Sequence, residues 1–455
     1  MDPAREPHVR MPMLSFRHMI WPRLLRRLGK ARWHCQVALM FVCAYVWRRL
    51  LFRTTFIAIT GSVGKTTCKE CLADALGRSF PTARTFRNQN DYSGVPRSLL
   101  RVRPWHRFAV IEVAANGLGL MYRSAPLVRP DIAIVLRLTR NHMKNFRTLD
   151  NVAREKAALV ANLSPQGIAL LNGDDARVAA LAASLKKRVV WFGSSPSFDY
   201  WAEAESSKWP NRLSFVLHAG RERVDVATQL MGMHWKYSVL AAIAAAHLSG
   251  VPLLEAVSAV GQTQPVIGRM QPVLLPGGAI IVRDELDGSI DTLPPAFQAM
   301  EEAVASRKIL VLSGVTDSSR GPRDRYRRLG GEVARIFDAA VFIGDTAEHG
   351  VRGAIAGGMS ASQAHAFLSL QDAERFLTAE LRLGDLVLLK GRMVDHVSRL
   401  AFAIAGPIRC RKTRCDKMIL CDNCPELGAV TPLLPVAALS QPEIFPPPPG
   451  AMEAG

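Results

Sequence analysis

The chain has 455 residues, 49% of them hydrophobic, which indicates a multidomain globular protein with two or three buried cores and excludes a single small domain. Its formal net charge of +19 favours anionic partners such as nucleic acid, acidic lipid or phosphorylated substrates, without choosing among them. No secretory signal with a small-residue cleavage site is evident, so we expect the eight cysteines to be free thiols in a reducing cytoplasm.

Residues 1–53 form a basic segment with eleven Lys or Arg residues against two acids. Within it, WHCQVALMFVCAYVW (residues 33–47) is apolar, but it is shorter than the roughly twenty residues that a bilayer core requires. Its tryptophans and tyrosine lie among arginines, which favours an interfacial helix on an anionic membrane surface, peripheral at the inner face. Packing on the next domain or on a partner protein is the alternative.

A strand, a glycine turn and a helix follow in FIAITGSVGKTTCKE, residues 56–70. Because Ile59 stands where the strict nucleotide fingerprint has its first glycine, the turn matches only the shorter form GxxGKTT. Such a turn lets backbone N–H groups close on phosphate oxygens at a helix N-terminus. We therefore expect ATP to bind to the loop formed by Gly61, Ser62, Val63, Gly64, Lys65, Thr66 and Thr67. Lys65 would reach the terminal phosphates, and Thr66 would ligate Mg²⁺.

The next apolar strand lies in FAVIEVAANGLG, residues 108–119, and Glu112 comes just past its apolar run. A Mg·ATP site requires hard oxygen ligands near the phosphates. The carboxyl end of a parallel strand is where such ligands gather. Glu112 is therefore predicted as a Mg²⁺ ligand, with a buried structural glutamate as the alternative.

The second half of the chain alternates apolar runs with helical segments. GAIIVRD, KILVLSGV, AAVFIGD and LVLLKGR are typical of parallel strands. The predicted fold is α/β: a P-loop central domain with a parallel sheet (residues 54–264) and a second Rossmann-like α/β domain (residues 265–406). A short basic helical N-terminus precedes them, and a Cys-rich tail follows.

The tail, residues 407–455, combines a cysteine cluster with a Pro-rich end that is typical of disorder. The segment CRKTRCDKMILCDNC separates its cysteines by four, five and two residues. Two pairs suit a tetrahedral Zn²⁺ site, although the first pair is wider than usual, and an iron–sulfur cluster is the next choice. The predicted zinc ligands are Cys410, Cys415, Cys421 and Cys424. Cys68 and Cys71, by contrast, lie on the helix after the glycine turn, and we expect Cys71 to pack in the core.

These segments resemble the Mur ligase family, most of all its MurF-like type, which adds D-alanyl-D-alanine to a UDP-muramoyl tripeptide. The similarity runs over about residues 55–400 and is carried by TGSVGKTT, RNQNDYSGVPRSLL, FAVIEVAANGLG, RPDIAIVLRLTRNHMKNFRTLDNVAREKAALV, GIALLNGDDARV, GMHWKYSVLAAIAAA, IGRM and GDLVLLKGR. It implies a cytoplasmic ATP-dependent, ADP-forming ligase that joins a carboxylate to an amino acid or other amine through an acyl phosphate. ATP and Mg²⁺ are the implied cofactors.

The resemblance also assigns roles to single residues of the first half. Lys65, Glu112, His142 and Lys156 form the implied catalytic set, with Glu112 and His142 as metal ligands. Lys156 matches a lysine that is often carbamylated by CO₂ and then ligates a second Mg²⁺. Alanines follow it where the family commonly has glycine and glutamate, so a plain salt-bridging lysine is the alternative.

In the second half, the resemblance implies that Arg269 contacts the phosphates, Asp284 meets the ribose and His234 marks the adenine side. Two departures bear on the substrate. The family's N-terminal UDP-binding domain has no counterpart here, and its acceptor motif Y-N-A-N-P is replaced by LDGSI at residues 286–290. Trp235 and Ser238 also replace asparagines. We therefore expect the fold and the ATP chemistry to carry over better than the substrate.

A nucleotide-dependent scaffold or binding protein at a membrane, with the P-loop kept and ligation lost, is the competing interpretation. The altered acceptor motif favours it, and the second α/β domain, which a simple nucleotide switch does not need, argues against it. Nucleic acid is not expected as a partner, because aromatic residues do not alternate with basic ones on the expected strands.

Overall fold

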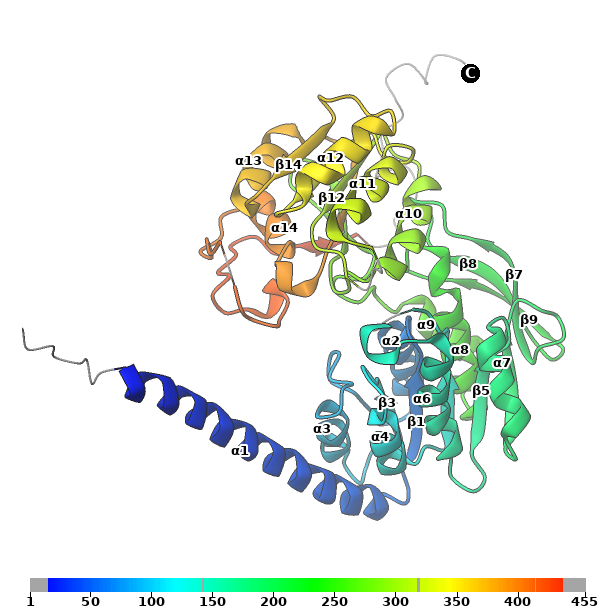
Figure 1. Ribbon diagram of the computed structural model, residues 1–455. Coiled ribbons are helices and arrows are strands. Elements are labelled where there is room, and N and C mark those ends of the chain that lie inside the picture. Colours follow the sequence, from blue (N-terminus) through cyan, green and yellow to red (C-terminus); the bar gives the residue numbers. More distant parts are fainter. Residues whose placement is uncertain (1–14, 141–142, 317–319, 414, 437–455) are drawn as a thin grey trace, which may run out of the picture.

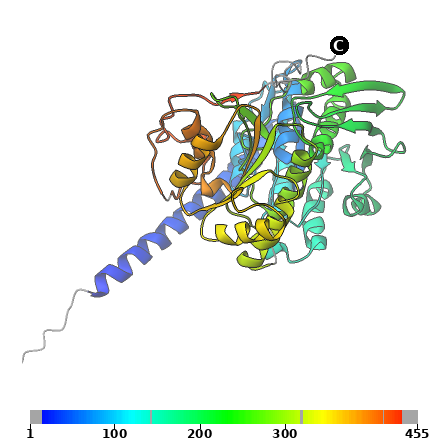
Figure 2. The same cartoon turned by 90° about the horizontal axis from the view of Figure 1, so that it is seen from above.

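The computed structural model describes residues 15–140, 143–316, 320–413 and 415–436. Figure 1 shows two α/β bodies and a long N-terminal helix, α1 (Ser15–Leu50), that runs outward from the side of the first body. Figure 2, turned by 90°, shows the same helix leaving the body. The helix is longer than the apolar stretch of residues 33–47 suggested. Across the described residues, no helix is both long enough and apolar enough to cross a membrane.

The first body is built on a nine-stranded sheet of order β2-β3-β1-β4-β5-β6-β7-β8-β9. The strands are β1 (Thr55–Thr60), β2 (Thr82–Arg84), β3 (Phe108–Glu112), β4 (Ile132–Val135), β5 (Ile168–Asn172), β6 (Arg188–Gly193), β7 (Tyr200–Ser206), β8 (Ser214–Ala219) and β9 (Glu222–Ala227). Neighbours from β2 to β7 pair in parallel, as predicted, whereas β7, β8 and β9 pair antiparallel. The sheet is therefore mixed rather than wholly parallel.

Two helical layers cover this sheet because successive side chains of a strand point to opposite faces. In β1, Ile57 and Ile59 join a core with helices α2 and α8, while Phe56 and Ala58 join one with α1, α3, α4 and α6. Both faces are buried, which explains the continuous apolar runs of the central strands. The helices after α1 are α2 (Lys65–Gly77), α3 (Gly94–Arg101), α4 (Leu120–Val128), α5 (Met143–Phe146), α6 (Leu149–Ala161), α7 (Ala176–Leu181), α8 (Lys236–Leu248) and α9 (Leu253–Gly261), with 3₁₀ turns η1 (Ala182–Ser184) and η2 (Met233–Trp235).

The second body holds a seven-stranded sheet of order β14-β13-β12-β15-β11-β10-β16. Its strands are β10 (Gln271–Leu274), β11 (Ile280–Asp284), β12 (Arg307–Leu312), β13 (Ala339–Ile343), β14 (Ala364–Phe367), β15 (Asp385–Lys390) and β16 (Leu434–Pro435). The four predicted strands are β11, β12, β13 and β15, and they pair in parallel. Helices α10 (Leu293–Glu301), α11 (Pro322–Val333), α12 (Ala347–Ala356), α13 (Leu370–Glu380) and α14 (Ser398–Ala405), with 3₁₀ turns η3 (Ile290–Thr292), η4 (Met393–Asp395) and η5 (Cys421–Asn423), complete this part.

The described part of the tail is attached to this second sheet. Strand β16 pairs antiparallel with β10 at its edge. The Arg283 guanidinium, itself buried, contacts the Asp422 carboxylate at 2.7 Å. The cysteine segment is thus held against the domain by a strand pair and a partly buried ion pair.

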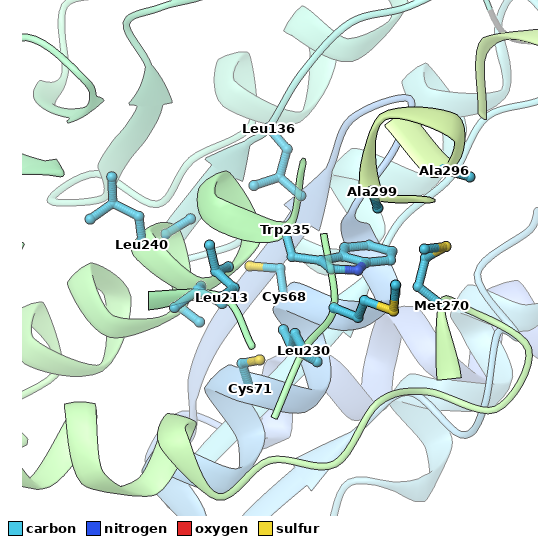
Figure 3. Close-up of a cluster of buried hydrophobic side chains, with 14 of the residues drawn as sticks. Cys68, Cys71, Leu136, Leu213, Leu230, Trp235, Leu240, Met270, Ala296 and Ala299 are labelled. Carbon is cyan, nitrogen blue, oxygen red and sulfur yellow. The ribbon is translucent and has the colours of Figure 1, made fainter. Parts of the chain in front are cut away.

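A shared apolar cluster joins the two bodies (Figure 3). The indole of Trp235 lies between helix α2, which carries Cys68 and Cys71, and Met270 and Ala299 of the second body. Both cysteines are fully buried, as expected for Cys71, and burial raises the pKa of each thiol. Because this core continues across the boundary, the two bodies pack directly against each other there.

Candidate active site

The glycine turn after β1 is held in a shape that only glycine accommodates. Gly61 has φ of 148°, and a Cβ there would lie 2.9 Å from the Leu136 Cβ. Gly64 has φ of 84°, and a Cβ there would lie 2.5 Å from the Ser238 Oγ. The Ser238 hydroxyl donates a hydrogen bond to the Gly64 carbonyl at 3.0 Å. Ser238, which departs from the family's asparagine, therefore supports the loop directly.

The segment after β4 fixes the rest of the turn. The Ser62 amide donates to the Arg137 carbonyl at 2.8 Å, and the Ser62 hydroxyl accepts from the Thr139 amide at 2.9 Å. Val63 forms an isolated bridge with Arg137. Thr66 and Thr67 begin helix α2 and are buried. The predicted phosphate loop is thus a rigid turn at the N-terminus of a thirteen-residue helix, the geometry that favours anions.

Lys65 lies over this turn. Its ammonium donates to the carbonyls of Gly61 at 2.9 Å and Ser62 at 3.0 Å. Burial lowers its pKa from the ordinary lysine value, against the opposing charge of Glu112. This half-buried cation has hydrogen bonds only to carbonyl oxygens among the described residues, so it is placed to gain from a phosphate group.

Glu112 ends β3 beside the turn and is fully buried. Its Oε1 accepts hydrogen bonds from the Thr66 hydroxyl at 3.1 Å and from the Asn90 amide. Its Oε2 is buried with no hydrogen-bond partner among the described residues. An ionised oxygen in that position is costly unless a cation meets it. Glu112 and Thr66 together fit the hard oxygen set that Mg²⁺ prefers.

Lys156 lies on α6 and is 3% exposed. Burial, with the neighbouring charge of Lys65, lowers its pKa to about 7. Within the described residues, no hydrogen bond or ion pair accompanies its ammonium. The preceding Glu155 has a structural role, since its carboxylate accepts the Gly119 and Met121 amides at the start of α4. The salt bridge that Lys156 could have formed with its neighbour is therefore absent from this part of the chain. His142 lies outside the described residues.

Arg269 and Asp284 of the second body face His234, which lies on η2 of the first body, across the site. His234 and Arg269 line the same cavity, of about 620 Å³, as Gly64 and Asp284. Burial, and then the charges of Lys390 and Arg269, lowers the pKa of His234 to about 3, so this imidazole is neutral at physiological pH. The His234 Nδ1 and the Arg269 Nε are both buried and have no partner among the described residues. Two polar atoms are thus available for a ligand in the cavity.

Two further residues of the second body, Asp287 and Lys390, were missed as site residues. The Lys390 ammonium contacts the Asp284 carboxylate at 2.7 Å and the Asp287 carbonyl at 2.7 Å. Burial opposes ionisation of Asp287, but Arg269, Lys390 and Lys65 outweigh it and lower its pKa. Asp287 belongs to the LDGSI segment, so the altered acceptor motif still puts an anion beside Lys65. The Asp284–Lys390 pair depends on strand register, which local sequence does not reveal.

The four tail cysteines gather at one place in the fold. They line one narrow cavity together with His396, whose Nδ1 lies 3.7 Å from the Cys421 Sγ. The Arg399 guanidinium contacts the Cys410 Sγ, and the Lys417 ammonium contacts the Cys424 Sγ, both at 3.5 Å. Across the described residues, no three His, Cys, Asp or Glu side chains are arranged to hold a metal ion. Zinc binding by the tail stays a prediction.

These features define the class: an α/β protein whose strand-turn-helix phosphate loop faces a second α/β domain. Residues 59–246 match the Mur ligase middle domain, so this part of the chain is similar to the Mur ligases. The resemblance to Mur ligases and the fold class predicted from the sequence are thereby confirmed.

Individual ligases and a solved structure are also similar to this chain. The UDP-N-acetylmuramoyl-tripeptide–D-alanyl-D-alanine ligase of Escherichia coli (strain K12) is 29% identical over 266 residues, which cover 58% of this chain and 59% of that enzyme. The ligase of the same name from Mycobacterium bovis is 27% identical over 390 residues, covering 79% of this chain and 74% of the relative. A crystal structure of MurF from Acinetobacter baumannii has a TM-score of 0.75 at 25% identity, over 81% of this chain and 80% of that one. The chain thus spans less than two thirds of the E. coli enzyme.

Proposed function

We propose that this protein is an ATP-dependent, ADP-forming ligase that joins a carboxylate to an amine through an acyl phosphate. The observation that carries the proposal is the grouping of half-buried Lys65 with the buried Glu112 and Lys156 beside the glycine turn. A protein that only binds nucleotide needs Lys65 and one metal ligand, but it has no use for a buried lysine beside them. The relatives' printed names supply the first candidates: a UDP-N-acetylmuramoyl tripeptide as the acid and D-alanyl-D-alanine as the amine.

The reaction has two steps. A carboxylate oxygen of the acid attacks the γ-phosphorus of ATP, the bond to the β,γ-bridging oxygen breaks, and ADP leaves. The amine nitrogen then attacks the carbonyl carbon, inorganic phosphate leaves with one former carboxylate oxygen, and the amine loses a proton. Neither step requires a covalent bond to the protein, so positioning and charge neutralisation carry the catalysis.

The chain's own groups match these demands. The loop amides and Lys65 hold the phosphates, and Arg269 faces Lys65 from the second domain. Glu112 Oε2 and the Thr66 hydroxyl would hold Mg²⁺, which neutralises charge on phosphate oxygens when bound. The neutral His234 lies on the wall where the nucleobase is expected, and the Asp284–Lys390 pair lies where the ribose is expected.

Lys156 has a second proposed role as a carbamate. A lysine with a pKa of about 7 is largely a neutral amine slightly above that pH, and only the neutral amine attacks CO₂. The nitrogen–carbon bond forms, one proton is released, and the side chain becomes an anion. An anion there would relieve the repulsion from Lys65 and could hold a second Mg²⁺ near the carboxylate.

The test is ADP release by the full chain with acid and amine supplied separately and together, beginning with the pair in the relatives' names. We expect release to depend on both. Lys156→Ala should lose ligation while ATP binding is nearly unchanged, and bicarbonate or short carboxylic acids should partly restore activity by replacing the carbamate oxygens. If Lys156→Ala keeps full ligase activity, or if the wild type hydrolyses ATP equally with every acid and amine, the scaffold interpretation replaces this one.

A further inference from the structure

Helix α1 has two apolar faces, and only one of them is covered by the protein. The covered face carries Val37, Phe41, Ala44 and Arg48 and continues at Leu51, whose amide just past the helix still donates to the Trp47 carbonyl; the successive spacings are four, three, four and three residues. Val37, Ala44 and Leu51 are buried. Since helical residues advance by about 100° each, these five lie within a sector of about 80°. This face docks α1 on the central domain.

Specific contacts hold that docking. Phe41 stacks on Tyr92 with ring centroids 4.5 Å apart. The Trp47 indole donates to the Val102 carbonyl at 2.9 Å. The Arg48 guanidinium donates to the carbonyls of Val128 and Arg129 at 2.7 and 2.8 Å. The orientation of the helix about its own axis is therefore fixed, and so is the direction of its opposite face.

The opposite face is an apolar stripe that faces outward. It consists of Leu39, Val42, Val46 and Leu50, which are between 53% and 64% exposed. By the same rotation they also lie within a sector of about 80°, and the centres of the two sectors are about 180° apart. Figures 1 and 2 show the helix extending beyond the body. A contiguous apolar stripe on one helix face marks an interaction surface.

The charge of helix α1 indicates which kind of partner binds the apolar stripe. Helix α1, Ser15–Leu50, contains eight Lys or Arg residues and no acidic residue. Arg32 and Arg53 are exposed and lie beyond the two ends of the stripe in sequence, and the Arg49 guanidinium stacks on Tyr45 with 3.2 Å from its carbon to the ring centroid. A second copy of this chain would bring two such cationic helices together, and their like charges would repel. Anionic lipid complements the charge and the apolar stripe at once.

We propose that the outward face of α1 binds the surface of an anionic bilayer, with Leu39, Val42, Val46 and Leu50 entering the boundary between headgroups and acyl chains. The arginines around the stripe lie at headgroup level. The helix lies on the membrane surface, and the central domain packs against the opposite face of the helix. This surface takes no part in the ligase reaction, so the membrane-binding proposal and the proposed function are tested independently.

The experiment is sedimentation of the full chain with vesicles of phosphatidylcholine alone and of phosphatidylcholine with about 30 mol% phosphatidylglycerol. We expect binding only to the anionic vesicles, and loss of binding near 1 M salt, where charges are screened over about 3 Å. The variant Leu39→Gln/Val42→Gln/Val46→Gln should bind at least about tenfold more weakly than wild type. A matched control changes three equally exposed apolar residues elsewhere, Leu254→Gln/Val304→Gln/Leu383→Gln, which are 61% to 67% exposed, and should bind like wild type.

A second variant separates charge from apolar contact. Arg32→Gln/Arg53→Gln should weaken binding by about fivefold per arginine at low salt, with its melting temperature and ADP release unchanged. Three outcomes would overturn the proposal: equal sedimentation with both vesicle types, wild-type binding by the stripe variant, or a dimer in solution that only the stripe variant dissociates. The last outcome would assign the face to a second copy of the chain.

Discussion

Lys156→Met should stabilise the protein, because the wild-type lysine is buried without a described partner. Lowering its pKa from 10.5 to about 7 corresponds, at about 1.4 kcal/mol per tenfold change, to a cost of ~5 kcal/mol for the charged form. This full cost applies below about pH 7, where the folded state must carry the ammonium. Methionine keeps the length of the apolar stem and removes the charge.

The pH dependence has a definite sign. Between about pH 7 and 10.5 the unfolded state binds a proton that the folded state does not, so the stability of the wild type rises with pH relative to the variant. At about 2 °C per kcal/mol for a domain of this size, Lys156→Met should melt about 10 °C above wild type at pH 6.5. The difference should shrink toward zero near pH 10. Melting is followed by calorimetry in bicarbonate-free buffer, because carbamylation would change the group.

Lys69→Met is the matched control. Lys69 is equally buried, but its ammonium pairs with Glu70 at 2.7 Å and donates to the Thr85 carbonyl at 3.0 Å. Removing it leaves those acceptors unsatisfied, so this variant should melt below wild type. If Lys156→Met melts at or below the wild-type temperature at pH 6.5, or if the difference does not change with pH, the isolated buried lysine and the carbamate argument built on it are refuted.

Three further predictions concern the phosphate loop, the metal ligand and the tail. Lys65→Ala should abolish ADP release without a loss of circular dichroism signal, since the ammonium meets loop carbonyls and phosphate; unchanged turnover would remove its phosphate role. Glu112→Gln should raise the Mg²⁺ concentration for half-maximal activity by about 10- to 100-fold, because the amide keeps the shape of the carboxylate but loses its charge; an unchanged Mg²⁺ dependence would leave Glu112 as a structural residue. Purified protein should contain about one zinc per chain, measured by atomic absorption, and none after serine replaces Cys410, Cys415, Cys421 and Cys424; visible absorbance with iron would indicate a cluster instead.

Local patterns predicted the elements whose signals are short in sequence. The apolar run into GSVGKTT gave β1, its turn and α2, and four apolar runs gave β11, β12, β13 and β15. Glu112 was found because it directly follows an apolar run. The antiparallel pairing of β7, β8 and β9 was missed, since pairing direction depends on connections that composition does not encode.

The facing wall of the site was harder to predict because its geometry comes from distant segments. Lys390 meets Asp284 only through the parallel register of β15 with β11. The carboxylate of Glu155, beside Lys156 in sequence, accepts amides at the start of α4 instead of forming an ion pair with the lysine among the described residues. Only the folded chain reveals how deeply a charged side chain is buried and which neighbours it has; burial first, and then Lys65, lowers the pKa of Lys156.

The most direct test of the ligase account follows oxygen atoms. An acid labelled with ¹⁸O in both carboxylate oxygens is incubated with the full chain, ATP, Mg²⁺ and an amine, beginning with UDP-N-acetylmuramoyl tripeptide and D-alanyl-D-alanine and extending to other acids and amino acids. Released phosphate is then analysed by mass spectrometry. If an acyl phosphate forms, one ¹⁸O passes into phosphate for each amide bond made. Amide product with unlabelled phosphate, or ATP hydrolysis that no acid or amine alters, would contradict the account.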